Sequence, residues 1–342
     1  MAYKTYREDK FKNISMDNKS NKSDLNRLLK ENEILKQSIN AIEGINIDNI
    51  TDLDAFTIKP NRSLKEECTA ITQFGDAHYD EIVNPSITNG LNEYNPTIAK
   101  IRTEKYFARL IYSLRLYKRA GIRVNNLVLH LVGDFISGWI HEELIQTNSM
   151  TPIEATRFAE ELLIKGIKTL GEYTDLKETV VICTVGNHSR TTRKNQFKNS
   201  VITSYEFIAY KHMEDYFSQH GFSNIKFVIS ESPYTYYKVY DWINKFSHGN
   251  HFKYQGGIGG IEVPLKKWIH REQTVMPFDM AWIGHWHQFS SGNKVRINGS
   301  VIGYNEMARL YGFTPEPPQM QFQLLDKKRG YTWNGPIILT DW

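Results

Sequence analysis

The sequence predicts an α/β domain that follows an N-terminal helical extension, and three observations lead to this fold class. In the first half of the domain, short apolar runs typical of buried strands alternate with long amphipathic helices. In the second half, strand-like stretches follow one another. Short turns that contain Gly, Asp, Asn or His come directly after five of the predicted strands. A chain of 342 residues is long enough for one large domain of this kind with an appendage.

Residues 1–66 are predicted to form a separate N-terminal segment, and residues 67–342 the main domain. Residues 1–23 are polar and rich in Lys, Asn and Ser, which is typical of disorder. A heptad pattern follows, and its two core positions are occupied by Leu25, Leu28, Asn32, Leu35, Ile39 and Ile42. The pattern covers fewer than three heptads, so two interpretations stay open: a helix packed on its own chain, and a helix that forms a homodimer. Residues 44–66 are interpreted as a connector.

The first half of the main domain contains three predicted strands and three predicted helices. The strands are expected at 71–74, 126–132 and 179–185. The helices are expected at about 97–120, 151–171 and 199–219. The second helix opens with Thr151-Pro-Ile-Glu154, which is a capping box with proline at the first helical position.

The second half of the domain is predicted to be rich in strands. They are expected at 225–230, 234–240, 243–247, 279–283, 294–297 and 320–325. The last of these is expected to form a hairpin with 331–339 across the turn at 326–330. The domain therefore combines a βαβ first half with a β-rich second half.

The composition predicts a cytoplasmic protein with no membrane partner. The N-terminus has no apolar core of the kind found in signal peptides, and no apolar run approaches the length of a membrane span. Cys68 and Cys183 lie in unrelated contexts, and Cys183 sits inside an apolar run. A buried free thiol in a reducing compartment is therefore expected. The net charge of +4 is compatible with a polyanionic partner but does not require one.

Possible metal ligands follow five of the predicted strands. In chain order they are Asp76 and His78, Asp134, Asn187, His248, and the pair His285 and His287. The carboxyl ends of strands in α/β sheets are where ligands and metals are gathered. D-x-H and H-x-H in an extended segment would project both side chains to one side. Imidazole and carboxylate together suit Mn, Fe, Zn or Ni.

These motifs, D-x-H, G-D, G-N-H, H and G-H-x-H in this order, resemble the signature of the calcineurin-like metallophosphoesterase superfamily over about residues 70–300. The resemblance implies an αββα sandwich of two mixed sheets and two divalent metal ions. Mn²⁺ is expected to be the best activator, because the seven donors offer nitrogen and oxygen atoms and none is a cysteine. It implies that Asp76, His78 and His287 bind one metal, that Asn187, His248 and His285 bind the other, and that Asp134 bridges them. His188 would not be a ligand and would protonate the leaving oxygen or stabilise its charge.

The sequence departs from the pattern of many superfamily members at three places. Ser137 occupies the position of a second aspartate that orients the catalytic histidine, so the partner of His188 is not evident. Gly138-Trp139 replaces the arginine, and Ser189-Arg190 the acidic residue, that are found in relatives of the protein Ser/Thr phosphatases. These absences disfavour a protein phosphatase.

A cluster of cations follows the G-N-H motif and suggests the substrate class. Arg190, Arg193, Lys194 and Lys198 are either a solvated face or contacts for a nucleic-acid backbone. Next to a metal site the sequence favours a nuclease that hydrolyses DNA or RNA, similar to the repair-exonuclease branch of the superfamily. One alternative is a phosphodiesterase or phosphatase acting on cyclic nucleotides or dinucleotides. Another is a non-catalytic scaffold subunit, which would have no physical need for seven ligands.

Overall fold

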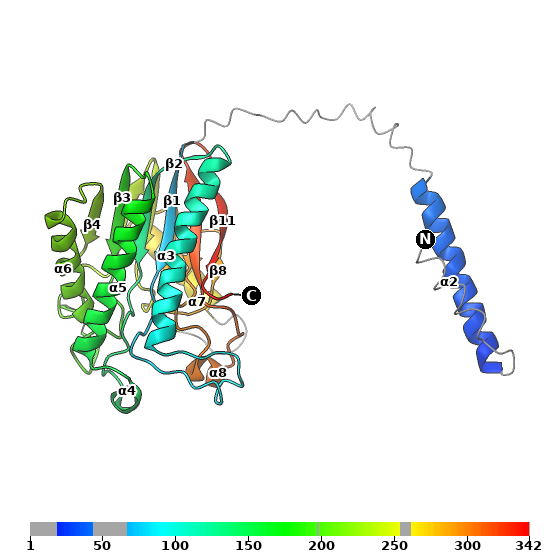
Figure 1. Ribbon diagram of the computed structural model, residues 1–342, viewed down its shortest axis with the longest axis horizontal. Coiled ribbons are helices and arrows are strands. Elements are labelled where there is room, and N and C mark those ends of the chain that lie inside the picture. The colour runs from blue at the N-terminus through cyan, green and yellow to red at the C-terminus, as the bar shows by residue number, and fades with distance from the viewer. Residues whose placement is uncertain (1–18, 44–66, 197, 254–260, 342) are drawn as a thin grey trace. The chain divides into compact units, whose positions relative to one another are not determined.

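The computed structural model of the chain describes residues 19–43, 67–196, 198–253 and 261–341 (Figure 1). The chain divides into two units, Met1–Arg62 and Ser63–Trp342. The predicted disordered segment up to residue 18 and the predicted connector at 44–66, with the domain boundary, lie outside the described residues. Within the first unit, α2 (Lys19–Glu43) is a single helix. Residues 19–23, which were expected to be disordered, are therefore helical, because a polar turn extends the helix beyond its apolar pattern.

The larger sheet of the second unit has six strands in the order β11-β10-β1-β2-β3-β4. Its strands are β1 (Glu67–Phe74), β2 (Arg123–Leu131), β3 (Glu178–Cys183), β4 (Ile225–Ile229), β10 (Gln319–Asp326) and β11 (Gly330–Ile338). β1 to β4 are parallel, whereas β10 is antiparallel to both β1 and β11. The parallel strands bring their carboxyl ends to one edge of the sheet, where the loops after β1, β2 and β3 meet.

The smaller sheet has five strands in the order β5-β6-β7-β9-β8. Its strands are β5 (Thr235–Val239), β6 (Trp242–Phe246), β7 (Met280–Ile283), β8 (Ser290–Ser291) and β9 (Val295–Ile297). β6, β7 and β9 are parallel, and the two edge strands are antiparallel to their neighbours. Both sheets are therefore mixed, as the resemblance implied.

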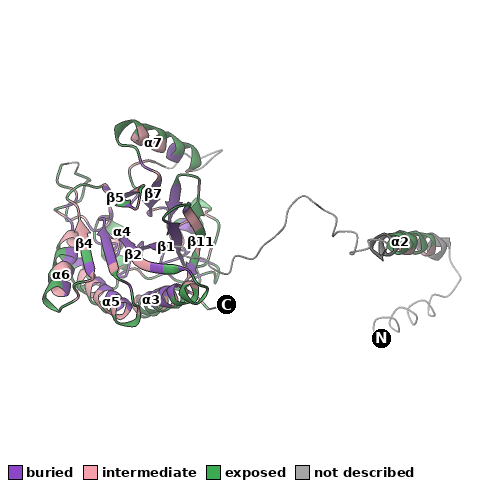
Figure 2. Ribbon diagram, turned by 90° about the horizontal axis from the view of Figure 1, so that it is seen from above, coloured by how far each residue is buried: buried purple, intermediate pink, exposed green. Residues whose placement is uncertain are grey.

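Helices cover the outer faces of both sheets, which gives four layers (Figure 2). The helices of the second unit are α3 (Pro96–Arg119), α4 (Glu142–Thr147), α5 (Pro152–Tyr173), α6 (Tyr205–Gln219), α7 (Glu262–Val275) and α8 (Glu306–Tyr311). α3, α5 and α6 lie on the six-stranded sheet, and α7 lies on the five-stranded sheet (Figures 1 and 2). The predicted αββα sandwich is thus confirmed.

Local signals in the sequence set the helix boundaries. The predicted capping box of α5 is present, because the Thr151 side chain accepts from the Glu154 amide and Glu154 accepts from the Thr151 amide. α6 begins at Tyr205 and not near residue 199, as the sequence analysis expected. Ser204 caps this helix and also forms an isolated antiparallel β-bridge with Arg190. This backbone pairing keeps the residues that precede Ser204 out of the helix. α7 was not predicted.

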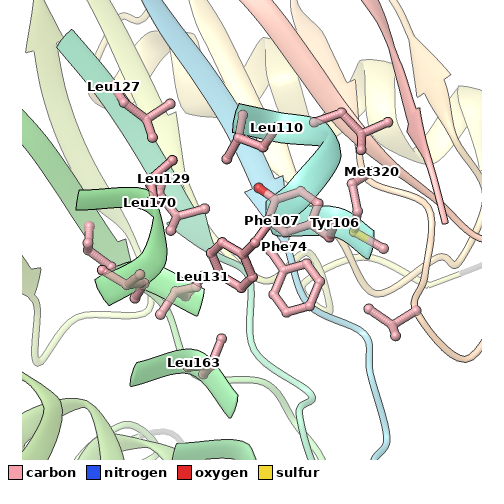
Figure 3. Close-up of a cluster of buried hydrophobic side chains, with 14 of the residues drawn as sticks. Phe74, Tyr106, Phe107, Leu110, Leu127, Leu129, Leu131, Leu163, Leu170 and Met320 are labelled. Carbon is pink, nitrogen blue, oxygen red and sulfur yellow. The ribbon is translucent and has the colours of Figure 1, made fainter. Parts of the chain in front are cut away.

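Alternation along β1 distributes its side chains between two cores. Phe74 packs with Tyr106 and Phe107 of α3 on the helical side, where the two rings Phe74 and Tyr106 stack at 4.4 Å (Figure 3). Ile71 faces the other way and packs between the sheets with Trp282 of β7. Both faces of β1 are therefore buried, and this burial fixes the position of the strand whose carboxyl end leads into the loop at Asp76.

Among the described helices, none combines the length and the apolar character that crossing a membrane requires.

Candidate metal centre

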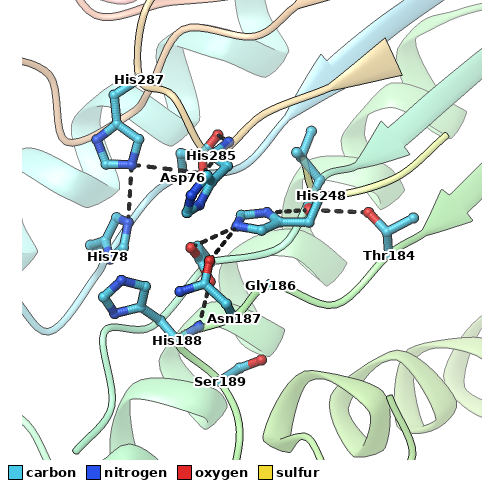
Figure 4. A network of polar contacts seen from close by, with 12 residues as sticks. Asp76, His78, Thr184, Gly186, Asn187, His188, Ser189, His248, His285 and His287 are labelled. Atoms are coloured by element: carbon cyan, nitrogen blue, oxygen red, sulfur yellow. Dashed lines mark hydrogen bonds and ion pairs between the residues drawn. The ribbon is translucent and has the colours of Figure 1, made fainter. Parts of the chain in front are cut away.

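The seven predicted donors come together where the loops after β1, β2, β3, β6 and β7 meet (Figure 4). Two groups of three have ligand atoms within 4.8 Å of one another, namely Asp76, His78 and His287, and Asp134, His248 and His285. Asn187 lies beside the second group, with its Oδ1 3.1 Å from His248 Nε2. The first group contains the three residues that the resemblance implied for one metal, and the second contains Asp134, His248 and His285. The assignment of these residues as metal ligands, with Asp134 as the bridge, stays a prediction.

The donor loops have an unusual backbone conformation. In the described part of the chain, seven non-glycine residues have φ between +47° and +69°, and five of them are predicted donors: Asp76, His78, Asp134, His285 and His287. The expectation that D-x-H and H-x-H are extended is therefore wrong. A left-handed residue costs about 1–2 kcal/mol relative to its usual conformation, although Asp and His tolerate it better than most. Such strain is typical of functional sites, where the surrounding structure enforces it.

Two glycines allow the carboxylates to enter the centre. A Cβ on Gly186 would lie 1.9 Å from Asp134 Oδ1, and a Cβ on Gly284 would lie 2.4 Å from Asp76 Oδ2. Both distances are far below van der Waals contact, so any larger residue would displace a carboxylate. The glycines of the G-N-H and G-H-x-H motifs are thus required by the close approach of the loops.

Backbone amides hold the carboxylates and the loops in register. The His285 amide donates to both carboxylate oxygens of Asp76, at 3.1 and 3.0 Å. The His188 amide donates to Asp134 Oδ1 at 2.8 Å. The amides of Ala77 and His78 donate to the Asp134 carbonyl. Each carboxylate is consequently fixed by a loop that follows a different strand.

Hydrogen bonds at the far side of the imidazoles fix their tautomers. His248 Nδ1 lies 3.0 Å from the Val132 carbonyl, which can only accept, so Nδ1 carries the proton and Nε2 faces Asp134 Oδ2 at 2.9 Å. His78 Nδ1 lies 2.7 Å from Ser137 Oγ, and the Ser137 hydroxyl donates to Glu81 Oε1. His78 therefore donates through Nδ1, and its Nε2 faces His287 Nε2 at 3.3 Å. Metal-bound histidines in proteins are usually oriented in this way.

His188 points into the same space but is held differently. Its Nδ1 lies 3.1 Å from the Ser137 carbonyl, so Nδ1 is protonated and Nε2 is the free ring nitrogen. Its ring meets the edge of the His78 ring, with the centroids 4.9 Å apart. The Ser137 carbonyl thus takes the place of the missing aspartate as the partner of His188, while the Ser137 hydroxyl contacts His78. The sequence analysis did not identify this partner.

Burial and a neighbouring carboxylate together set the pKa values of the imidazoles. It lowers the pKa of His287 to about 4 and shifts the pKa of His78 well below its ordinary value, so both rings are neutral at neutral pH. Burial also acts to lower the pKa of His248, but the adjacent Asp134 carboxylate outweighs it and raises that pKa to about 9. Neutral imidazoles are ligands, and a buried carboxylate that stabilises positive charge favours a cation. The donors present therefore fit divalent metal ions.

Two buried carboxylates that the sequence analysis did not assign support the centre. Glu206, near the start of α6, accepts from the Phe135 amide at 2.7 Å and from the Gly186 amide at 2.8 Å. It joins the loops after β2 and β3, and burial raises its pKa to about 7. Asp80, two residues after His78, is fully buried and accepts from the amides of Ser137 and Gly138. An acid near a helix start is common, so the sequence gives no signal for the role of Glu206.

The predicted substrate-binding cations differ in their surroundings. The Arg190 guanidinium donates to the carbonyls of Asn187, Thr192 and Arg193, so it holds its own loop. Arg193 pairs with Glu142 at 2.6 Å, and both side chains are exposed. Lys194 is exposed as well. The structure thus directs Arg190 toward its own loop and leaves Arg193 and Lys194 on the surface.

The structure is similar in outline to several solved structures. The vacuolar protein sorting protein Vps29 from Cryptosporidium parvum is 14% identical, with 79% of this chain and 96% of that one covered and a TM-score of 0.30. Vps29 from Entamoeba histolytica, in complex with Zn²⁺, is 10% identical, with 79% and 99% covered and a TM-score of 0.29. The hypothetical protein PH1004 from Pyrococcus horikoshii OT3 is 10% identical, with 80% and 87% covered and a TM-score of 0.37.

No protein family model matches the chain, and no curated protein matches it. The TM-scores of the structural likenesses are low, so they carry no argument about chemistry. The chain's own residues define the class: an αββα sandwich with two groups of buried and half-buried His and Asp side chains that could hold metal ions at its strand ends. This architecture is the one that the resemblance to the metallophosphoesterases implied.

Proposed function

We propose that the protein is a metal-dependent phosphodiesterase with two divalent ions and that its substrate is DNA or RNA. One observation carries the proposal: two His and Asp triads lie side by side, and His188, which belongs to neither, points into the same space. A protein that only used the fold as a scaffold would have no reason to hold five donors in left-handed backbone. The proposal includes Mn²⁺ as the best activating metal.

The donors divide the metal binding between them. Asp76, His78 and His287 would hold one ion, and Asn187, His248 and His285 the other, with Asp134 between them as the bridge. When bound, two such ions polarise a phosphoryl group, supply a strong nucleophile by lowering the pKa of water, and stabilise both the attacking and the leaving oxygen. The amides that donate to Asp76 and Asp134 keep the carboxylates in place when the ions are exchanged.

His188 would act on the leaving group. Its Nδ1 proton is committed to the Ser137 carbonyl, so a second proton can reside only on Nε2. Nε2 would donate that proton to the leaving oxygen, or a hydrogen bond to its developing charge. Burial lowers the pKa of His188, which makes the ring a better proton donor but reduces its protonated fraction at neutral pH.

Surface features beside the centre favour nucleic acid as the substrate. Arg193 and Lys194 lie in the loop that directly follows Asn187 and His188, and both are exposed. Trp139, in the loop after β2, is 48% exposed and is available to stack on a base, whereas Trp286 is buried among core rings. Exposed cations and an exposed aromatic ring are what a single-stranded nucleic acid requires.

The substrate class is tested with EDTA-treated protein supplied with Mn²⁺. Linear DNA, RNA, cyclic nucleotides and bis-p-nitrophenyl phosphate are compared, and hydrolysis of a nucleic acid is expected. If only the small substrates turn over, the enzyme acts on small nucleotides; if none does, the protein is a scaffold.

The contribution of the surface cation is tested with Lys194→Ala. This change should weaken nucleic-acid binding and reduce the slope of log binding constant against log salt concentration by about one. Hydrolysis of the small diester should stay unchanged. Lys328→Ala is the matched control, because Lys328 is exposed in the turn after β10 at the opposite end of the sheet. Equal effects of the two variants would contradict a role for Lys194 in substrate binding.

A further inference from the structure

One face of α2 carries an apolar seam that is exposed in the described residues. Of its members, Leu28 is 37% exposed and Leu35 is 47% exposed. By sequence, the seam continues at Ile39 and Ile42, with the alternating spacing of three and four residues that a two-stranded coiled coil requires. Apolar side chains at this spacing on a helix in water favour burial against a partner of the same pattern.

Asn32 interrupts the seam at its centre. It occupies the same heptad position as Leu25 and Ile39, whereas Leu28, Leu35 and Ile42 occupy the other core position. A single Asn at the core position shared with Leu25 and Ile39, together with Leu at the core position of Leu28 and Leu35, is the pattern that selects two parallel helices in register. The amides of the two Asn32 side chains then face each other and form a hydrogen bond in the interface.

The charges that flank the seam are complementary between two copies. Glu31 directly precedes Asn32, and Lys36 directly follows Leu35, which places them at the two positions that border the core. In a parallel pair, Glu31 of one helix faces Lys36 of the other, and two-fold symmetry creates this contact twice. Within one helix Glu31 contacts only Arg27 among the described ion pairs, at a long 3.9 Å between two exposed groups.

We propose that α2 docks on α2 of a second copy of this chain to form a parallel, in-register, two-stranded coiled coil. An antiparallel pair would set Asn32 against an apolar residue of the other core position and leave its amide without a partner. It would also set each flanking heptad position against the same position of the partner, so Glu31 and Lys36 would no longer face each other. The protein is therefore a dimer with two metal centres, each on its own second unit. This inference does not depend on the activity of the centre.

The association is tested by sedimentation of the full chain at several concentrations. The wild type is expected to sediment as a dimer that dissociates on dilution, because the seam spans fewer than three heptads. Leu28→Glu with Leu35→Glu should give a monomer at every concentration. Lys30→Glu with Glu33→Lys is the matched control, because both positions lie away from the seam, and it should remain dimeric. A wild type that is monomeric throughout, or that forms trimers, would overturn the proposal.

Orientation and register are tested by cross-linking and by charge exchange. With Asn32→Cys, oxidation should join two chains by a disulfide, whereas Lys30→Cys should not; the two natural cysteines are buried. Glu31→Lys and Lys36→Glu should each weaken the dimer, on the order of tenfold in dissociation constant, and the double variant should recover it. Absence of the cross-link, or a double variant weaker than either single one, would contradict the parallel arrangement.

Discussion

Replacing Ser137 by alanine tests the proposed metal binding separately from the proposed proton transfer, because the two would use different parts of this residue. The Ser137 hydroxyl lies between His78 Nδ1 and Glu81 Oε1, whereas the Ser137 carbonyl accepts from His188. Alanine removes the hydroxyl and keeps the carbonyl. We therefore expect Ser137→Ala to weaken metal binding and to leave the action of His188 intact.

The size of the effect follows from the contacts of His78. Loss of a hydrogen bond that orients a metal-binding histidine typically lowers metal affinity about 10–100-fold, which corresponds to about 1.4–2.7 kcal/mol. Glu81 Oε1 already lies 3.4 Å from His78 Nδ1, so the carboxylate can accept directly once the hydroxyl is gone. The loss for Ser137→Ala should therefore be near tenfold. Ser137→Ala combined with Glu81→Ala should approach the upper end.

The assay is a calorimetric titration of EDTA-treated protein with Mn²⁺, followed by kcat at saturating metal. Ser137→Ala should shift the binding constant of one ion and leave kcat within about threefold of the wild type, since the Ser137 carbonyl still holds His188. Ser86→Ala, a change in an exposed loop serine, is the control and should alter neither quantity. Unchanged metal affinity, or a large loss of kcat at saturating metal, would refute the reasoning.

Four further predictions follow from the centre and from the core beside it. Asp134→Asn should abolish turnover and reduce the metal content, and two bound metals with near-normal rates would show that the bridge is assigned wrongly. His188→Ala should keep both metals while kcat falls about 10²–10⁴-fold, less for a p-nitrophenolate leaving group, and loss of metal would make His188 a ligand. Gly186→Ala should displace the Asp134 carboxylate and abolish activity in a protein that still folds, and an active variant would contradict the close approach. His130 is buried, and burial lowers its pKa to about 3, so the unfolded chain binds a proton that the folded chain does not. The contribution of neutral His130 to stability is present above pH 6.5 and is lost as the pH falls toward 3. His130→Gln should therefore reduce the slope of the unfolding free energy against pH, between pH 6.5 and 3, by about 1.4 kcal/mol per pH unit. An unchanged slope would contradict the neutral state of buried His130.

The parts of the fold that local signals encode were predictable from the sequence. The strands and α5 carry apolar runs and a capping box, and the hairpin formed by β10 and β11 lies where it was expected. α7 was not predicted, because Pro264 falls in its first turn, where proline is tolerated although it commonly marks a break. Its buried Leu265 and Trp268 have helical spacing, which was the available signal.

The composition of the candidate centre was predictable, but its supporting contacts were not. A gathering of Asp, Asn and His after successive strands indicates a metal site, since parallel strands end at one edge. The left-handed backbone at Asp76 and His285 arises from loops that pack on one another, which no local pattern specifies. The roles of Ser137 and Glu206 depend on contacts between residues far apart in the chain. Such contacts become visible only in three dimensions.

The central claim is that the gathered donors form a two-metal phosphodiesterase centre. Its most direct test is the hydrolysis of bis-p-nitrophenyl phosphate by EDTA-treated protein while Mn²⁺ is added in known ratio to the chain. We predict no hydrolysis without metal, a rate that rises as Mn²⁺ binds, and a plateau when two ions are bound per chain. A full rate in the absence of metal, or no hydrolysis with two ions bound, would contradict the account.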